Sequence, residues 1–118
     1  MEISDIASGD LPEVLALNEA SVPHVSSVSD AEMQWFMKHA HYFRVARIDG
    51  QLAGFLIGLR PGLAYTSPNY RWFSEHYDDF GYVDRVAVTR IARRRHVASR
   101  LYLSLIHISE PTRPFTLS

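Results

Sequence analysis

Five arginines lie within eleven consecutive positions and form the densest cluster of charge in the sequence. The whole chain has 12 Lys and Arg against 13 Asp and Glu, a formal net charge of −1, so the cluster is a local feature. A guanidinium group makes two parallel hydrogen bonds to a phosphate or carboxylate. The cluster therefore predicts either a local anion site or a solvated surface. Its members are Arg90, Arg93, Arg94, Arg95 and Arg100.

The residues on either side of this cluster favour the anion site. GYVDRVAVT, residues 81–89, is rich in valine and predicts a strand, and the residues after His96 have a helical apolar spacing. Where a strand turns directly into a helix, the free N–H groups and the positive dipole end of the helix face whatever lies beyond the strand. That environment suits a phosphate group.

The elements that must support this turn begin with a short strand predicted within residues 2–8. Asp10 is expected to cap the first helix, with Pro12 in its first turn and Glu13 as the capping-box partner. A second helix is predicted to begin at Ser29, with Glu32 as its partner. The expected buried positions are Leu11, Val14 and Leu15 in the first helix and Met33, Phe36, Met37 and Ala40 in the second.

Two β-rich runs, Tyr42–Ile48 and Leu52–Leu59, flank Asp49 and Gly50 and predict an antiparallel hairpin. A short aromatic helix is then expected to start at Ser67, with Tyr70, Phe73 and Tyr77 on one side. These rings either cover the edge of a small core or line a substrate pocket.

The composition indicates one small domain, since the chain has 118 residues, of which 47% are hydrophobic and 21% charged. There is no cysteine, and the sequence has neither a signal-peptide pattern nor an apolar run long enough to span a bilayer. We therefore expect a cytoplasmic protein with no nucleic-acid partner, no membrane partner and no metal. A phosphate-binding P-loop and a Gly-x-Ser-x-Gly hydrolase motif are both missing from the sequence.

At residues 93–98 the chain resembles the GNAT N-acetyltransferases. In that family an Arg/Gln-x-x-Gly-x-Gly/Ala motif follows the fourth strand and grips the pyrophosphate of acetyl-CoA through its backbone. The matching residues are Arg93, Arg94, Arg95, His96, Val97 and Ala98. The resemblance also implies that the backbone of the fourth strand, at Val86, Ala87 and Val88, binds pantetheine.

His96 stands where the family has its central glycine. A side chain there either turns outward and adds charge, or marks a weakened cofactor site.

The family's chemistry requires a base that deprotonates the amine acceptor, often a carboxylate on the fourth strand. The resemblance implies Asp84 as the better candidate, with Tyr82 on the same face of the strand by two-residue alternation. The alternative for Asp84 is an ion pair with a nearby arginine. The resemblance implies no acid, because the family's usual tyrosine lies beyond the matched part.

The residues from Leu103 to Arg113, LSLIHISEPTR, resemble the translation of a transposase-type sequencing-library adapter. We therefore expect a partial acetyltransferase domain at residues 1–102 and a non-native tail at residues 103–118. Leu105 and Ile108 nevertheless continue the helical spacing of Val97 and Leu101, so the helix is expected to run through this junction.

Together these observations predict an α/β (α+β), GNAT-like fold: a mainly antiparallel sheet flanked by helices, in the order β-α-α-β-β-(short α)-β-α and truncated before strand five. The implied function is acetyl transfer from acetyl-CoA to a small-molecule or peptide amine, with this chain an inactive fragment. The alternative is a non-catalytic anion-binding or regulatory module with a degenerate CoA site. The strand edge left open could pair with another chain, which makes a homodimer one expected assembly.

Overall fold

The computed structural model describes the chain apart from residues 61, 64, 66, 77–80, 109–114 and 118. Its strands are β1 (Glu2–Asp5), β2 (Tyr42–Ile48), β3 (Gln51–Leu59), β4 (Gly81–Val88) and β5 (Phe115–Leu117). Its helices are α1 (Leu11–Ala20), α2 (Asp30–His39), α3 (Pro68–His76) and α4 (Val97–Ile108), with short 3-10 turns at Ser8–Asp10 and Arg90–Ala92.

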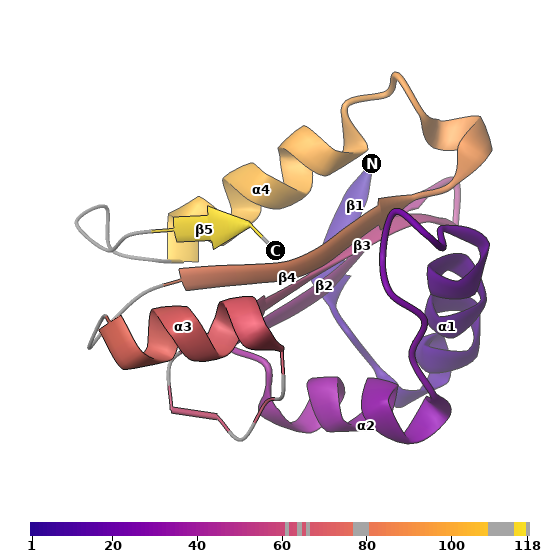
Figure 1. The fold of residues 1–118 in the computed structure, drawn as a ribbon. Helices are drawn as coiled ribbons and strands as arrows, with labels where there is room; N and C mark the ends of the chain where they lie inside the picture. Colours follow the sequence, from indigo (N-terminus) through magenta and orange to yellow (C-terminus); the bar gives the residue numbers. More distant parts are fainter. Residues whose placement is uncertain (61, 64, 66, 77–80, 109–114, 118) are drawn as a thin grey trace.

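The strands form one sheet in the order β1-β2-β3-β4-β5. The first four strands are antiparallel, whereas β5 is parallel to β4 and pairs with residues 81–83. α1 and α2 cover one face of the sheet, and α4 covers the other (Figure 1). The predicted fold class and the order of its first eight elements are thus confirmed.

Each face of the sheet has its own apolar core, because side chains alternate across the strands. The core facing α1 and α2 includes Val14, Met33, Phe36, Phe55 and Ile57. The core facing α4 includes Tyr42, Leu56, Val97, Leu101 and Leu105.

The predicted cap of α1 is wrong. Asp10 has helical backbone angles, φ −83° and ψ −19°, and makes no side-chain cap to α1. The reason is the 3-10 turn that precedes the helix: the Asp10 carboxylate points back to accept a hydrogen bond from the Ala7 backbone N–H at 2.9 Å. Its other oxygen pairs with Arg47 at 2.7 Å, and Arg47 also engages Glu13.

The predicted start of α2 and the hairpin are confirmed. Ser29 and Glu32 exchange side-chain to backbone hydrogen bonds of 3.1 Å each, which is the capping box. Between β2 and β3, Asp49 and Gly50 both adopt positive φ, 52° and 78°, as the tight turn requires.

The aromatic helix α3 begins at Pro68, one residue after the predicted start at Ser67, and the Tyr70 ring is buried against the core. Tyr77 and the side chain of Phe73 lie outside the described part of the structure. Helix α4 continues through Tyr102, as its apolar spacing predicts, and Leu105, one turn further along the helix, is also buried. Within the described residues, no helix is long and apolar enough to cross a membrane.

Candidate active site

Strand β4 contains a β-bulge at the position of the predicted base. Arg85 pairs with Ile57 of β3, but the next residue of β3, Gly58, pairs with Val83. Asp84 is therefore an extra residue on β4, and the strand bends and twists locally at this point.

The bulge changes which side chains share a face. Regular alternation would place Tyr82 and Arg85 on opposite faces of the sheet. Because Asp84 is inserted between them, both face α1 and α2, and the Arg85 guanidinium lies 5.2 Å from the centre of the Phe36 ring. The sequence pattern predicted only that Tyr82 and Asp84 share one face of the strand; the structure places Arg85 on the same face as Tyr82.

Asp84 and Arg85 form a buried ion pair, with Arg85 Nε 2.7 Å from Asp84 Oδ2 and each residue only 6% exposed. The other carboxylate oxygen, Oδ1, accepts a hydrogen bond of 2.6 Å from the hydroxyl of Tyr65. The ion pair that was the alternative role for Asp84 is therefore present. It leaves the catalytic role a prediction, since an ionised carboxylate in a cleft can also accept a proton.

The remaining N–H groups of Arg85 reach the loop between α1 and α2. Nη1 donates to Asn18 Oδ1 and to the Ser26 backbone carbonyl, each at 2.9 Å, and Nη2 donates to Ser26 Oγ at 3.0 Å. Asn18, which supplies this acceptor from α1, is fully buried. One guanidinium group thus joins β4, α1 and the α1–α2 loop.

A carboxylate on α1 holds the same loop from its outer side. Glu19 accepts hydrogen bonds from the Ser27 hydroxyl, from the Asn18 side chain at 2.8 Å and from the Val28 backbone at 3.2 Å. These three donors lower the pKa of Glu19, with Ser27 contributing most. The loop is therefore fixed through two polar anchors, Arg85 inside and Glu19 outside.

Tyr65 forms an aromatic wall beside Asp84. Its ring stacks on Trp35 of α2 with centroids 5.6 Å apart and an interplanar angle of 19°, and it meets Phe36 and Tyr70 edge to face. Burial and the negative charge of Asp84 raise the pKa of the Tyr65 phenol. Tyr65 therefore keeps its proton at neutral pH and acts as a hydrogen-bond donor to Asp84.

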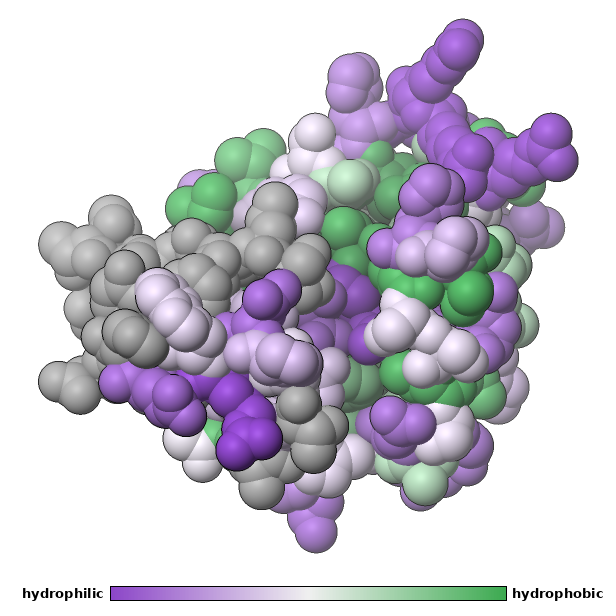
Figure 2. Space-filling model, in the orientation of Figure 1, coloured by the Kyte–Doolittle hydropathy of each residue, from purple (hydrophilic) through white to green (hydrophobic). Residues whose placement is uncertain are grey.

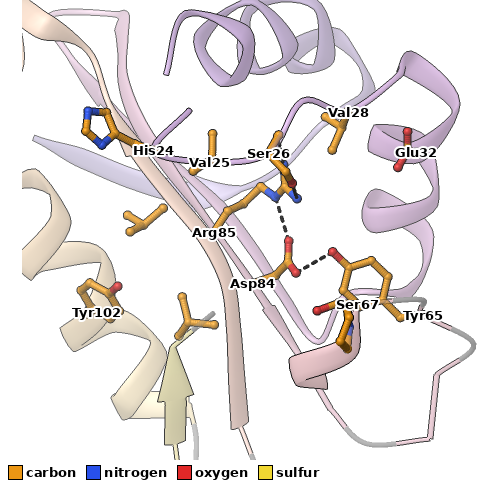
Figure 3. Close-up of a pocket in the computed structure, with 13 residues that line it drawn as sticks. His24, Val25, Ser26, Val28, Glu32, Tyr65, Ser67, Asp84, Arg85 and Tyr102 are labelled. Atoms are coloured by element: carbon orange, nitrogen blue, oxygen red, sulfur yellow. Dashed lines mark hydrogen bonds and ion pairs between the residues drawn. The ribbon is translucent and has the colours of Figure 1, made fainter. Parts of the chain in front are cut away.

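These groups border a cleft of about 590 Å³ along β4. In Figure 3, the α1–α2 loop and Tyr65 lie on one side of β4, and Tyr102 of α4 lies on the other. Burial raises the pKa of the Tyr102 phenol as well. The cleft is bordered by His24, Val25, Ser26, Val28, Glu32, Tyr65, Ser67, Pro68, the four residues 83–86 and Tyr102.

Of the two predicted catalytic residues, Asp84 borders the cleft and Tyr82 lies behind it. Tyr82 is 1% exposed and packs edge to face on Tyr70 at 5.4 Å. Its hydroxyl is 3.4 Å from Ser67 Oγ. Ser67 is the residue that connects Tyr82 to the border of the cleft.

The predicted pantetheine strand has one edge bordering the cleft. β3 pairs with one edge of β4 along its length, and β5 pairs with the other edge only at residues 81–83. Within the described part of the chain, no strand lies beside residues 84–88 on that second edge. Val86 borders the cleft, whereas the Ala87 side chain is buried in the core facing α1.

The basic turn leads from this edge into α4. Arg93, Arg94, Arg95 and His96 are all exposed, and Figure 2 shows hydrophilic side chains projecting at this corner of the molecule. His96 has φ +60°, the left-handed conformation that favours glycine. His96 therefore follows the backbone path expected of the glycine that it replaces, and its side chain is directed to solvent.

A glycine on β3 brings the start of α4 close to the sheet. A Cβ atom on Gly54 would lie 2.8 Å from the Ala87 carbonyl oxygen and 2.9 Å from the Val97 side chain. Only glycine leaves room for this approach. It places the first N–H groups of α4, which lack acceptors within the helix, near the end of β4.

The model of the Acetyltransferase (GNAT) family matches residues 10–112 of the sequence. This chain belongs to the GNAT acetyltransferase family. GNAT enzymes are N-acetyltransferases that use acetyl-CoA as donor, so the predicted family and enzyme class are confirmed. No curated protein matches the chain by sequence.

Several solved GNAT structures share the fold. An aminoglycoside 6'-N-acetyltransferase from Acinetobacter haemolyticus matches with a TM-score of 0.73 and 18% identity, over 100% of this chain and 79% of that one. A ribosomal-protein-alanine N-acetyltransferase from Brucella melitensis has a TM-score of 0.68 and 22% identity, over 100% and 80%. An aminoglycoside N-acetyltransferase in complex with CoA has a TM-score of 0.70 and 15% identity, over 99% and 78%.

Sequence reasoning missed most of the polar network beside Asp84 in this GNAT domain. Asn18 carried a usable signal, because it continues the apolar spacing of Leu11 and Val14 and so stands at a core position of α1. The roles of Arg85, Ser26 and Tyr65 have no such signal. They depend on the bulge and on contacts between segments far apart in the chain.

Proposed function

We propose that this chain binds acetyl-CoA along the open edge of β4 and at the basic turn, and that the cleft beside Asp84 receives an amine acceptor. The observation that carries the proposal is the continuity of these features. In the described part of the chain, the second edge of β4 has no neighbouring strand at residues 85–88, and this edge borders the cleft at one end and leads into the turn at the other. The backbone of β4 and the basic turn that follows it therefore form one continuous surface for the proposed cofactor.

The residues present fit the cofactor. The backbone of Val86, Ala87 and Val88 would hold pantetheine, and residues 93–98 would hold the pyrophosphate through backbone N–H groups and arginine side chains. The left-handed conformation of His96 keeps the glycine-like path of the turn. Acetyl-CoA supplies a thioester whose acetyl group can pass to nitrogen.

The protein's own contribution is to manage two protons. The amine must lose a proton as it becomes an amide, and Asp84, directly or through water, is the proposed acceptor. The thiolate released from the thioester must gain a proton. Tyr102 borders the other side of the cleft and stays protonated because burial raises its pKa, so it is the proposed donor.

The acceptor is proposed to be a small-molecule or peptide amine. Similar GNAT structures include enzymes named for aminoglycosides and for ribosomal-protein alanine. The cleft itself offers Glu32 and the rings and hydroxyls of Tyr65 and Ser67 as further contacts.

Calorimetric titration with acetyl-CoA and, separately, with inorganic phosphate tests this proposal. We expect saturable binding of acetyl-CoA at concentrations at which phosphate alone gives little heat. Phosphate or nucleotide binding with no preference for CoA would instead support an anion-binding or regulatory module. No binding of either ligand would contradict both functions.

We further propose that residues 103–118 are foreign to the domain and that turnover by this chain is slow. β5 reaches only residues 81–83, which leaves most of β4 without a parallel neighbour in the described structure. Re-amplifying the source gene across the codon for Tyr102 should give a different continuation. Thiol release from acetyl-CoA with a panel of amines should then be much faster for the continued chain.

A further inference from the structure

We infer that Arg85 is a positioning residue that sets the α1–α2 loop and the Asp84–Tyr65 pair as one unit on the acceptor side of the cleft. This inference rests on the proposed function, since it assigns the unit to acceptor binding. It concerns the side chain of Arg85, which belongs neither to the basic turn nor to the backbone of Val86, Ala87 and Val88 that is proposed to hold pantetheine.

The geometry of the guanidinium group carries the inference. Nε faces Asp84 at 2.7 Å, whereas Nη1 and Nη2 face Ser26 at 2.9 and 3.0 Å. The guanidinium group of Arg85 is planar and rigid. If Ser26 moves away from β4, either these hydrogen bonds break or the guanidinium turns with Ser26 and its contact with Asp84 is disturbed. Asp84 in turn holds the hydroxyl of Tyr65.

The chemistry of the network points to function more than to stability. Placing an ion pair where its side chains are only 4% and 3% exposed costs desolvation, and a buried pair of this kind gives little net stability. Ser26, Asp84, Arg85 and Tyr65 all border the cleft. The bulge at Asp84 also interrupts the β3–β4 ladder to bring Arg85 to this face.

The loop offers a matched pair of serines for the test. Ser26 Oγ accepts from Arg85, and its neighbour Ser27 donates to Glu19 on the outer side of the loop. Ser26→Ala therefore removes a contact with β4, and Ser27→Ala removes a hydroxyl of the same size from the same loop without touching Arg85. Arg85→Lys keeps the charge beside Asp84 but loses the planar fork.

The experiment uses the 118-residue chain and needs no ligand. Backbone hydrogen exchange reports on residues 24–28, and the ring carbon that bears the hydroxyl of Tyr65, isotopically labelled, reports by NMR on its bond to Asp84. In Ser26→Ala and Arg85→Lys we expect loop exchange to accelerate about 10-fold or more and the Tyr65 resonance to shift. In Ser27→Ala the Tyr65 resonance should stay in place, whatever the exchange rate of the loop.

An unmoved Tyr65 resonance in Ser26→Ala, whether or not the loop opens, would overturn the inference, because Arg85 would then be a simple anchor. An equal shift in Ser27→Ala would overturn it too, because any loosening of the loop would suffice. If Arg85→Lys fails to fold, Ser26→Ala alone decides. Acetyl-CoA titration of the unsubstituted chain decides the proposed function separately, so the two ideas can fail independently.

Discussion

The bulge in β4 and the basic turn that follows the strand place their charged groups in different environments. At the bulge, Asp84 and Arg85 are almost fully buried and pair with each other. At the turn, Arg93, Arg94, Arg95 and His96 are all exposed to solvent. The comparison indicates that contacts within the protein hold the bulge, whereas the proposed binding groups of the turn are exposed.

The largest expected effect on stability comes from removing the cation at the bulge. Arg85→Ala should lower the free energy of unfolding by about 3–5 kcal/mol, because it leaves the Asp84 carboxylate buried without its cation. Urea unfolding measures the loss. The control Arg95→Ala, at an exposed position, should change stability by less than about 0.5 kcal/mol. Similar losses of unfolding free energy in both variants would contradict the distinction between the bulge and the basic turn.

Substitutions in the basic turn are expected to affect acetyl-CoA binding instead of stability. Arg93→Ala or Arg95→Ala should weaken acetyl-CoA binding by about 1.5–3 kcal/mol, the range for hydrogen bonds to charged groups. Their unfolding free energies should be nearly unchanged, since both side chains are exposed. Calorimetry and urea unfolding on the same samples separate the two quantities, and unchanged affinity in both variants would refute the anion site.

The motif at residues 93–98 and the polar network around Asp84 also differ in how well the sequence predicts them. The turn is local, so residues 93–98 were recognisable from their order alone, and the start of α4 at Val97 follows from it. The capping box of α2 and the hairpin turn were predictable for the same reason. Asp10 was not, because its partner Arg47 comes from a strand far along the chain.

The site around Asp84 was predictable only in part. Asp84 was a candidate because the family resemblance implies a carboxylate on the fourth strand. Arg85 could not be placed, because two-residue alternation assigns it to the wrong face and nothing in the sequence marks the bulge. Tyr65 and Ser26 come from irregular segments whose position is set by tertiary contacts.

A smaller effect is expected from relieving backbone strain at the turn. His96 has φ +60°, which costs a residue with a side chain about 1 kcal/mol relative to glycine. His96→Gly should therefore raise the unfolding free energy by roughly that amount and leave acetyl-CoA binding equal or tighter. Arg93→Gly is the matched control: Arg93 has φ −60°, and glycine there should not stabilise. A large loss of CoA binding in His96→Gly would give the imidazole a direct role.

The smallest effect concerns the outer anchor of the α1–α2 loop. Hydrogen bonds from Ser27, Asn18 and Val28 lower the pKa of Glu19 in the folded state. The ionised Glu19 therefore stabilises the closed loop fully above the ordinary carboxyl pKa of 4.5, and this stabilisation is lost as the pH falls through the lowered pKa of the folded state. Exchange of the loop amides, corrected for intrinsic rates, should rise between pH 6 and pH 3, and Glu19→Gln should remove most of that dependence. The same rise in the Gln variant would assign it to another group.

The most direct test of the central claim is to map acetyl-CoA on the backbone of this chain by NMR. The account predicts that shifts concentrate in the amides of Val86–Val88 and of residues 93–98, and that inorganic phosphate moves only the second set. Saturable acetyl-CoA binding whose shifts lie elsewhere, or no shift in either set at millimolar acetyl-CoA, would contradict the claim that β4 and its basic turn form one cofactor site.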